Sequence, residues 1–476
     1  MQITVSQALQ DCDAVLLYDK EYENLSFDGA AYDNRLVQKN NLFVCIKGEN
    51  NDGHNFAKDA VARGASAVLA EKNPFGENPP VPVLLVENSV KALGLLACKA
   101  RLRFGEDKTK KVIGITGTAG KTSVKELIAH ILSMEKDLSF NEKNVAKNPL
   151  NYNTQIGMPV SILNASGKEK YWVFELGISH AEDMDELGRI LWPDMAVILN
   201  AATGHSEGLG DMGVAYYKAQ LLNFLPQNGS AYVSGDYPDL FVHACYNKTD
   251  TKFFSTSSKK IPYQGKYLGV TEQGLGKYSL TTPTHSFEAE SIYVGEYGAE
   301  NCIAAASLAL ELGFSEEQIQ KALRTVQAPA MRFNKHELGQ WTLIDDTYNA
   351  NPLSAARMLE SAGELAEDKD FILVFGEMKE LGDLAEQEHE EFGRLAAQKN
   401  PLAVFFKGSF APALQKGLAE HNYTGMFSPL ENTEKFMEEI KKLPFTHAKH
   451  LIVFKGSRSN HLEEYVKAFT EQNNAV

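Results

Sequence analysis

Apolar runs and helical periodicities alternate along the first part of the chain. Short β-like runs cover residues 42–46, ASAVLA (65–70) and VPVLLV (81–86), and helical patterns cover residues 56–63 and 89–104. Runs of strand length that alternate with patterns of helix length are typical of α/β domains. The polar, charged segment 105–111 interrupts this pattern, so we predict a first α/β domain over residues 1–108.

A second series of the same kind comes next. It starts with an apolar run at 111–115, a glycine-rich turn and a helical pattern over 123–134, and continues with YWVFE (171–175) and MAVILN (195–200). Alternating strands and helices favour a mostly parallel sheet that is covered on both faces. Residues 229–293 are rich in Ser, Thr, Tyr, Lys and Gly, which predicts a β meander with loops. We therefore predict a central domain over residues 109–327.

The third series begins after a helical pattern at 315–326 and an Ala-Pro-Ala break. The strand candidates WTLID, FILVF, LAVFF and LIVF alternate with helical patterns at 353–367, 386–398, 433–442 and 462–469. This alternation again predicts a parallel α/β sheet, here of the Rossmann-like type, over residues 328–476.

Composition supports several globular domains and narrows the function classes. The chain has 476 residues, and single cores stop growing at about 250–300 residues. The five cysteines are scattered, which suits reduced thiols in a cytosol. The N-terminus lacks a signal-peptide pattern and no apolar run reaches about 20 residues, so we expect a cytoplasmic protein. A net charge of -15 argues against general binding of nucleic acid or anionic membrane.

The strongest chemical signal is GITGTAGKTS at 114–123, between a predicted strand and a predicted helix. A glycine-rich turn there brings backbone N–H groups close to phosphate oxygens, and a lysine and a hydroxyl can add charge and a magnesium ligand. Ile115 stands where strict Walker A spacing has glycine, so the loop is a variant. A tight turn with an incidental lysine is the alternative. The candidate phosphate-binding residues are Gly117, Thr118, Gly120, Lys121 and Thr122.

Polar residues end the next two strand candidates. Glu175 ends one, and in a parallel sheet its carboxylate lies at the edge where ligands collect and can hold magnesium. Asn200 ends the other and precedes a glycine-bounded loop with His205 and Glu207. A solvated strand end and an ordinary loop histidine are the alternatives. Lys218 lies in a helical pattern, where a lysine by itself indicates a solvated face.

The third part repeats this arrangement at its strand ends. LIDDTYNANP (343–352), FGEMKELGDL (375–384) and FKGSRS (454–459) each come after a predicted strand, so they point polar loops toward one edge. The alternative for one of the two residues Asp345 and Asp346 is that it only caps the next helix. The candidate hydrogen-bonding and cationic residues are Tyr348, Asn349, Asn351, Arg332 and Lys455.

Taken together, these motifs resemble the Mur ligase family over nearly the whole chain. YDNRLVQKNNLFVCIKGENNDGHNF (32–56) resembles its uridine-nucleotide domain, and NYNTQIGMP (151–159) its substrate-facing loop. The resemblance implies three domains, with a central P-loop ATPase-like sheet and a Rossmann-like C-terminal domain. The DDTYNANP segment resembles most closely the member that adds D-alanyl-D-alanine to UDP-N-acetylmuramoyl-tripeptide.

The resemblance also implies roles for individual positions. The implied catalytic residues are Lys121, Glu175, His205 and Lys218. Two magnesium ions would be bound by Thr122, Glu175, His205 and a carbamoylated Lys218. ATP would contact Gly117, Thr118, Gly120, Lys121, Thr122, Asn301, Arg332 and Asp346. The two other substrates would contact Asp33, Arg35, Asn151, Asn153, Tyr348, Asn349, Asn351 and Lys455. The chain departs from the family at Ala119, where a polar residue is usual, and at Gly298, which replaces the first Asn of the adenine motif.

The implied reaction is an ATP-dependent carbon–nitrogen ligation through an acyl-phosphate. ATP would phosphorylate the terminal carboxylate of the tripeptide, and the dipeptide amine would then displace phosphate, with positioning and charge neutralisation as the protein's task. A sister ligase that adds glutamates would lack the uridine-like domain and the DDTYNANP loop. A non-catalytic nucleotide-binding protein would need only the phosphate loop. We expect a monomer, and the third residue of the tripeptide, diaminopimelate or lysine, stays open.

Overall fold

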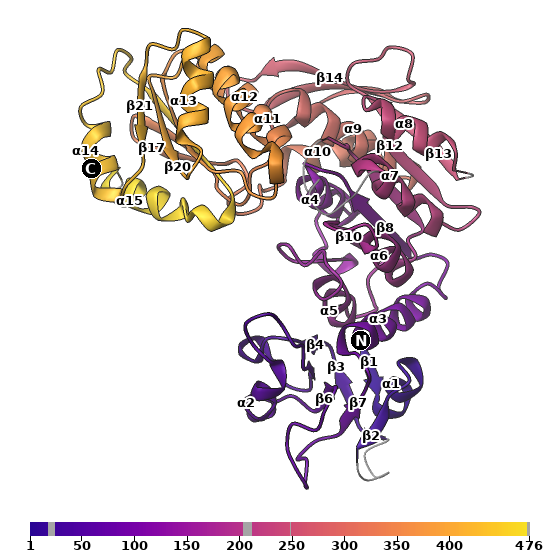
Figure 1. Cartoon of the computed structure of the whole chain (residues 1–476). Coiled ribbons are helices and arrows are strands. Elements are labelled where there is room, and N and C mark those ends of the chain that lie inside the picture. The colour runs from indigo at the N-terminus through magenta and orange to yellow at the C-terminus, as the bar shows by residue number, and fades with distance from the viewer. Residues whose placement is uncertain (18–23, 203–211, 248, 474–476) are drawn as a thin grey trace.

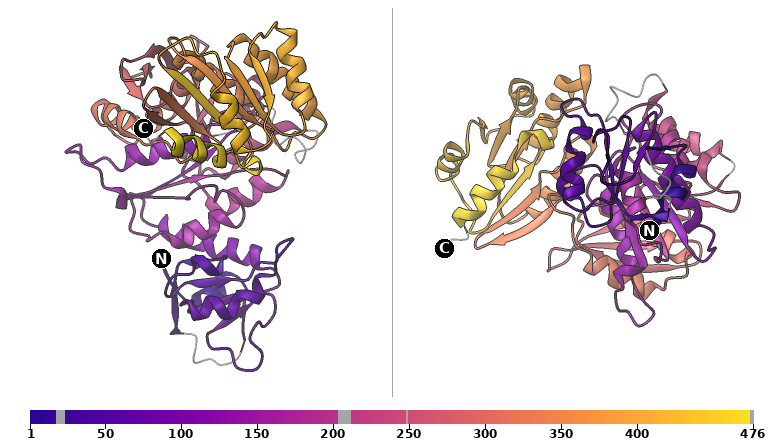
Figure 2. Two further views of the ribbon diagram at one scale, coloured as in Figure 1. Left: turned by 90° about the vertical axis from the view of Figure 1, so that its left-hand side faces the viewer. Right: turned by 90° about the horizontal axis from the view of Figure 1, so that it is seen from below.

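The chain folds into three α/β lobes in series. The computed structural model describes residues 1–17, 24–202, 212–247 and 249–473. Figures 1 and 2 show the N-terminal lobe and the C-terminal lobe attached to different sides of the middle lobe. None of the helices in these described ranges is long and apolar enough to cross a membrane.

The described residues of the N-terminal lobe form a five-stranded sheet in the order β2-β7-β6-β5-β4. Its neighbours are parallel except β2, which runs antiparallel to β7. The strands are β2 (Val15–Leu17), β4 (Ala30–Ala31), β5 (Leu42–Val44), β6 (Ala67–Ala70) and β7 (Val83–Leu85), with a separate antiparallel pair of β1 (Gln2–Thr4) and β3 (Ser26–Asp28). The helices are α1 (Val5–Asp11), α2 (Ala57–Ala62) and α3 (Ser89–Phe104).

Helix α3 joins this lobe to the next one. It has the bounds that its periodicity predicts, with Asn88 capping its N-terminus through a bond to the Lys91 N–H. It packs against α5 and α6 of the middle lobe, and the Phe104 ring stacks on Trp172 at 3.9 Å between centroids. One apolar core therefore runs through both lobes.

The middle lobe, in its described part, contains a nine-stranded sheet in the order β16-β15-β14-β13-β12-β11-β8-β10-β9. The strands are β8 (Lys111–Thr116), β9 (Val145–Lys147), β10 (Tyr171–Glu175), β11 (Met195–Ile198), β12 (Ser230–Ser234), β13 (Asp250–Ser255), β14 (Tyr263–Val270), β15 (Gly276–Thr281) and β16 (Ser286–Ser291). The helices are α4 (Lys121–Leu132), α5 (Gly157–Asn164), α6 (Asp183–Leu191), α7 (Gly213–Ala219), α8 (Pro238–Cys245), α9 (Glu296–Glu311) and α10 (Glu316–Thr325).

The prediction of a meander over residues 229–293 was only partly right. Strands β12 and β13 continue the parallel sheet, with α8 between them, and β14 pairs parallel with β13. Among the described residues of this range, only β14, β15 and β16 form an antiparallel meander. The polar composition misled because β12 (SAYVS) is buried along its whole length, so its serines contribute to a covered strand rather than to a solvent face.

The C-terminal lobe has, among the residues described, a six-stranded sheet in the order β17-β18-β22-β19-β20-β21, parallel except for β17. Its strands are β17 (Asn334–Leu338), β18 (Trp341–Asp346), β19 (Asp370–Gly376), β20 (Ala403–Lys407), β21 (Met426–Pro429) and β22 (His450–Lys455). Its helices are α11 (Pro352–Leu365), α12 (Ala385–Gln398), α13 (Ala411–Glu420), α14 (Thr433–Ile440) and α15 (Glu463–Asn473).

The predicted fold class is confirmed: three α/β domains, with a mostly parallel sheet in the central domain and a Rossmann-like parallel sheet in the C-terminal domain. The predicted boundaries after residues 108 and 327 stay predictions. Two groups of strands place polar loops at a sheet edge. β8, β10 and β11 are neighbours in the middle sheet, and β18, β22 and β19 are neighbours in the C-terminal sheet. Because parallel strands end at a common edge, the loops after them are gathered on each lobe.

Candidate active site

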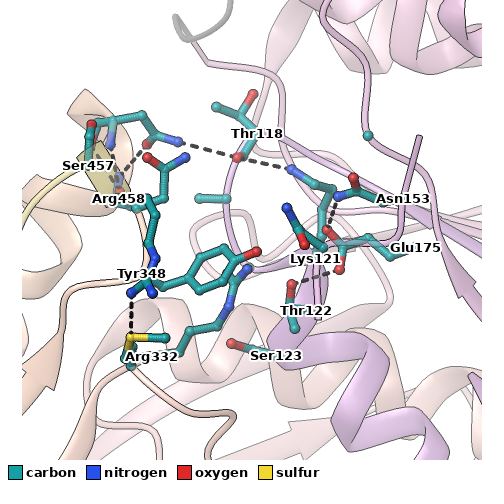
Figure 3. A pocket seen from close by; sticks show the side chains of 18 of the residues that line it. Thr118, Lys121, Thr122, Ser123, Asn153, Glu175, Arg332, Tyr348, Ser457 and Arg458 are labelled. Carbon is teal, nitrogen blue, oxygen red and sulfur yellow. Dashed lines mark hydrogen bonds between the residues drawn. The ribbon is translucent and has the colours of Figure 1, made fainter. Parts of the chain in front are cut away.

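A cavity of about 830 Å³ lies between the middle and C-terminal lobes. Figure 3 shows residues of the phosphate loop and β10 on one side of it, and Arg332, Tyr348, Ser457 and Arg458 on the other. Most of the predicted site residues line it: Thr118, Gly120, Lys121, Thr122, Asn151, Asn153, Glu175, Asn301, Arg332, Asp346, Tyr348, Asn349, Asn351 and Lys455. Segments that are far apart in the sequence thus meet at one site.

The phosphate loop has the predicted strand–turn–helix setting. β8 ends at Thr116, and α4 begins at Lys121 without a side-chain cap. Gly120, the residue before the helix, has φ of 82°, which favours glycine. The Lys121 Nζ donates to the Gly117 carbonyl at 2.7 Å and so lies folded over the loop. An uncapped helix N-terminus beside a lysine is suited to bind phosphate.

Glu175 presents a fixed, ionised carboxylate at the end of β10. Its Oε2 accepts from the Thr122 hydroxyl at 2.7 Å, and its Oε1 accepts from the Asn153 amide at 2.8 Å. Burial acts to raise its pKa, but the charges of Lys121, Arg332 and Lys125, together with the hydrogen bond from Thr122, outweigh burial and hold the pKa below its ordinary value. A hydroxyl and a carboxylate beside a phosphate loop are the hard oxygen ligands that Mg²⁺ prefers.

Lys218 is buried on α7 next to these groups. Burial, and then the positive charge of Lys121, lower its pKa well below the ordinary value, while Glu175 opposes them. The expectation from helical pattern alone, a solvated lysine, was wrong because α7 turns this face inward; Lys218 is only 3% exposed. A larger neutral fraction makes its amine a better nucleophile toward carbon dioxide. The predicted metal ligand His205 lies outside the described residues, as does Glu207.

Asn200 holds the phosphate loop in place. Its side chain accepts from the Ala119 N–H at 2.8 Å and donates to the Ala119 carbonyl at 3.0 Å. Its carbonyl accepts from the Thr118 N–H at 3.1 Å. An amide that pairs with both backbone groups of one residue fixes that residue's peptide planes, so the loop is held in shape before any ligand binds.

A buried amide, unpaired among the residues described, lies on the middle-lobe side of the cavity. Asn301 on α9 is fully buried, and neither its amide nitrogen nor its amide oxygen has a hydrogen-bond partner within the described part of the chain. A buried amide left unpaired costs about 1–3 kcal/mol. A ligand with a donor beside an acceptor, such as adenine, satisfies both atoms. Asn301 also lies next to the phosphate loop, because a Cβ on Gly120 would be 2.9 Å from its Oδ1.

The C-terminal lobe contributes a buried ion pair and a stacked cation. The Lys455 Nζ lies 2.6 Å from Asp346 Oδ2 and donates to the Asn349 carbonyl at 3.1 Å. Burial raises the pKa of Asp346, and the charge of Lys455 opposes that rise. The Arg332 guanidinium lies 4.0 Å from the centre of the Tyr348 ring, which holds it over the cavity.

The other predicted residues that the structure describes do not line this cavity. Gly117 and Lys218 adjoin it: the Gly117 carbonyl accepts from Lys121, and Lys218 is buried on α7. Asp33 lines a second cavity of about 450 Å³, which includes Tyr32, Tyr152 and Asn164 and so joins the N-terminal and middle lobes. Arg35 pairs with Asp33 at 2.6 Å and is mostly exposed beside this second cavity.

Sequence reasoning missed several residues of the site. Lys125 on α4 is fully buried and donates to the Asn148 carbonyl at 2.7 Å, and the Asn148 amide in turn bonds both backbone groups of Glu175. Glu300 and Arg357 form an ion pair between lobes. In sequence alone, a helical lysine or a charged residue beside an apolar position does not indicate that the residue belongs to a functional site. Groups of three or more His, Cys, Asp or Glu placed to hold a metal are absent from the described residues.

Comparison with known proteins gives consistent matches along the chain. Three family models match: "Mur ligase family, catalytic domain" at residues 27–101, "Mur ligase middle domain" at 115–309, and "Mur ligase, glutamate ligase domain" at 331–458. The chain is 30% identical to the UDP-N-acetylmuramoyl-tripeptide--D-alanyl-D-alanine ligase of Bacillus subtilis, over 96% of each chain.

Solved structures agree with this match. The chain is similar to MurF from Acinetobacter baumannii with a TM-score of 0.84 and 26% identity, covering 99% of each chain. It is also similar to MurF ligase from Thermotoga maritima in complex with ADP, with a TM-score of 0.77 and 25% identity, covering 94% of this chain and 98% of that one.

Proposed function

The chain belongs to the Mur ligase family, and on this premise we propose that it joins D-alanyl-D-alanine to UDP-N-acetylmuramoyl-tripeptide with conversion of ATP to ADP and phosphate. The observation that carries the proposal is the meeting of Lys121, Glu175 and Asp346 at one cavity between two lobes. The curated relative with 30% identity bears the name of this activity. The cavity residues and the name of this relative both fit the proposed activity better than they fit a ligase that adds glutamates or a protein that only binds nucleotide.

The middle lobe would hold the phosphates of ATP. The N–H groups at the start of α4 and the ammonium of Lys121 supply positive charge at the point where the phosphate loop ends. Asn301 would receive the adenine, since its two unpaired amide atoms match a neighbouring donor and acceptor. Across the cavity, Asp346 would bind the ribose and Arg332 would face the terminal phosphate.

Thr122 and Glu175 would hold magnesium, and Lys218 as a carbamate would add a second carboxylate beside them. When bound, magnesium offsets the repulsion between an attacking carboxylate and the γ-phosphate. The residues of the chain prepare this arrangement. Asn153 and Thr122 fix the two oxygens of Glu175, and the lowered pKa of Glu175 keeps it ionised at neutral pH.

The other substrates would approach from two sides. The uridine nucleotide would bind in the second cavity with Asp33 and Arg35, which leaves the peptide free to extend along Asn151 and Asn153 toward the phosphate loop. The dipeptide would lie against Tyr348, Asn349, Asn351 and Lys455. Its amine then displaces phosphate from the acyl-phosphate, and closure of the lobes excludes the water that would hydrolyse this intermediate.

A phosphate-release assay tests the proposal. Purified protein with Mg²⁺ and ATP should release phosphate only when UDP-N-acetylmuramoyl-tripeptide and D-alanyl-D-alanine are both present. The tripeptide should be supplied in two forms, with diaminopimelate and with lysine at the third position. Single D-alanine in place of the dipeptide is the control. Equal turnover with D-alanine would reject this specific activity and leave ATP-dependent ligation standing.

A further inference from the structure

Helix α11 of the C-terminal lobe touches the middle lobe at three successive points. Its N-cap residue Asn351 donates to the Thr118 carbonyl of the phosphate loop at 3.4 Å. Farther along, Arg357 donates to Glu300 Oε2 at 2.5 Å. One turn later, the Ser361 hydroxyl donates to the Val294 carbonyl at 2.6 Å. Figure 1 shows α11 at the junction of the two lobes, beside the end of α9.

The second of these contacts is a buried ion pair. The side chains of Arg357 and Glu300 are 14% and 4% exposed, and Arg357 also donates to the Tyr237 hydroxyl at 3.0 Å. A buried carboxylate without its counter-charge is strongly destabilising. Glu300 belongs to the middle lobe and Arg357 to the C-terminal lobe, so this pair is complete only while the lobes are docked.

Glu300 is linked in turn to the phosphate loop. Its Oε2 accepts a hydrogen bond from Asn200 Nδ2 at 3.3 Å. The same nitrogen donates to the Ala119 carbonyl, and the Asn200 oxygen accepts from the Ala119 N–H. The amide that shapes the phosphate loop is therefore oriented by the carboxylate that Arg357 holds. A continuous series of hydrogen bonds leads from α11 to the backbone of Ala119.

We propose that Arg357 is a positioning residue of the phosphate loop. Through Glu300 and Asn200 it makes the nucleotide-binding form of the loop depend on docking of the C-terminal lobe. Because coupling between two equilibria is reciprocal, nucleotide in the loop also strengthens docking. This inference rests on the proposed function, since it takes the ligand of the loop to be a magnesium nucleotide.

A second observation at Arg357 supports this dependence. The residue lines the cavity, and its buried Nη1 has no hydrogen-bond partner among the residues that the structure describes. The side chain that completes the interlobe pair therefore borders the cavity itself, so docking of the lobes and the shape of the cavity depend on the same guanidinium.

Calorimetric binding of Mg-ADP tests the inference, with Ser361→Ala as a matched control. Both Arg357→Met and Ser361→Ala remove an interlobe contact of α11, but only Arg357 is linked to the phosphate loop. We expect Arg357→Met to weaken ADP binding by about tenfold or more, as removal of a buried charged partner does. We expect Ser361→Ala to stay within about twofold of the unsubstituted chain. Equal weakening by both variants, or a change below about twofold in Arg357→Met, overturns the inference.

Two further variants separate positioning from a general loss of structure. Arg357→Met combined with Glu300→Gln removes both charges, so it avoids an unpaired buried carboxylate and should fold, yet it should bind ADP as weakly as Arg357→Met alone. Arg357→Lys keeps the charge opposite Glu300 and should recover part of the affinity. In turnover assays, Arg357→Met should raise the KM for ATP more than it lowers kcat. A double variant with full affinity contradicts the inference.

The binding assay needs no acceptor or dipeptide, so its failure is distinguishable from failure of the proposed substrates. If the unsubstituted chain binds Mg-ADP but does not use D-alanyl-D-alanine, only the substrate assignment falls. If it binds no Mg-ADP at all, both proposals fall.

Discussion

Substitution of Glu175 by glutamine removes one buried negative charge and little else. The glutamine has nearly the same shape, and both partners of the carboxylate can adapt: the Thr122 hydroxyl can accept as well as donate, and the Asn153 amide can turn over. What cannot adapt is the charge. Lys125 is buried and Lys121 is half-buried, and the charge of Glu175 opposes the lowering of the pKa of both lysines.

The expected loss of stability comes from this charge. The described residues show no direct ion pair between Glu175 and either lysine, so the roughly 3–5 kcal/mol that loss of a buried pair partner costs is an upper range here. The hydrogen bonds can be remade and the lysines can shed protons, so we take the lower end, about 3 kcal/mol. For a domain of roughly 200 residues each kcal/mol shifts the thermal midpoint by about 2–4 °C, so we expect a decrease of about 6–12 °C.

The dependence on pH has a definite sign. The pKa of Glu175 is lower in the folded chain than its ordinary value of 4.5. Its charge therefore stabilises the fold fully above the unfolded pKa and progressively less as the pH falls through the folded pKa. The difference in midpoint between the two proteins should be full at pH 7 and should shrink below about pH 4.5.

Glu169→Gln is the matched control, because Glu169 is a buried carboxylate just before the opposite end of β10, bonded to the Ser166 N–H and to Trp172. Differential scanning calorimetry with and without Mg-ADP gives both readouts. Glu175→Gln should also reduce turnover by at least about 100-fold, while Glu169→Gln should retain Mg-ADP binding. A Glu175→Gln midpoint within about 2 °C of the unsubstituted chain, or unchanged Mg-ADP binding, would refute the reasoning.

Two further predictions concern Lys218 and Gly298. Lys218→Ala should lose activity that a short carboxylic acid partly restores by replacing the carbamate, as measured by phosphate release; full activity of the variant would remove the carbamate from the mechanism. Gly298→Ala should lower the thermal midpoint, since its Cβ would lie 2.2 Å from the Tyr278 hydroxyl and overpacking costs about 1–3 kcal/mol. Adding Tyr278→Phe should recover part of that loss, and a Gly298→Ala protein as stable as the unsubstituted chain would contradict the packing argument.

Much of the fold is determined by patterns that are local in sequence. The bounds of α3 and β10 agree with the predicted ranges because each has a continuous apolar or periodic pattern. α10 begins after Ser315, where a capping box with Gln318 marks the start. Strands β17 and β21 and helix α13 were missed. The polar edge strand β17 is defined by its pairing with β18, and such pairing has no local signal.

The site was less accessible to sequence reasoning because its contacts are not local. The strand ends predicted the polar loops, and most of the site residues that the family resemblance named line the cavity. Neither could supply Glu300 and Arg357, which are 57 positions apart on helices of different lobes. A buried lysine such as Lys125 looks like a solvated one in sequence, and only packing distinguishes them.

The two departures from the family pattern are accounted for by their neighbours. At residue 119 the loop contributes its backbone, since Asn200 bonds both the N–H and the carbonyl of Ala119; these contacts do not require a polar side chain there. At residue 298 a side chain would collide with the Tyr278 hydroxyl, which donates to the Tyr293 carbonyl and fills that space. On the proposed function, Asn301 would be the one amide of this motif left to bind adenine, and its two amide atoms, unpaired within the described part of the chain, support that role.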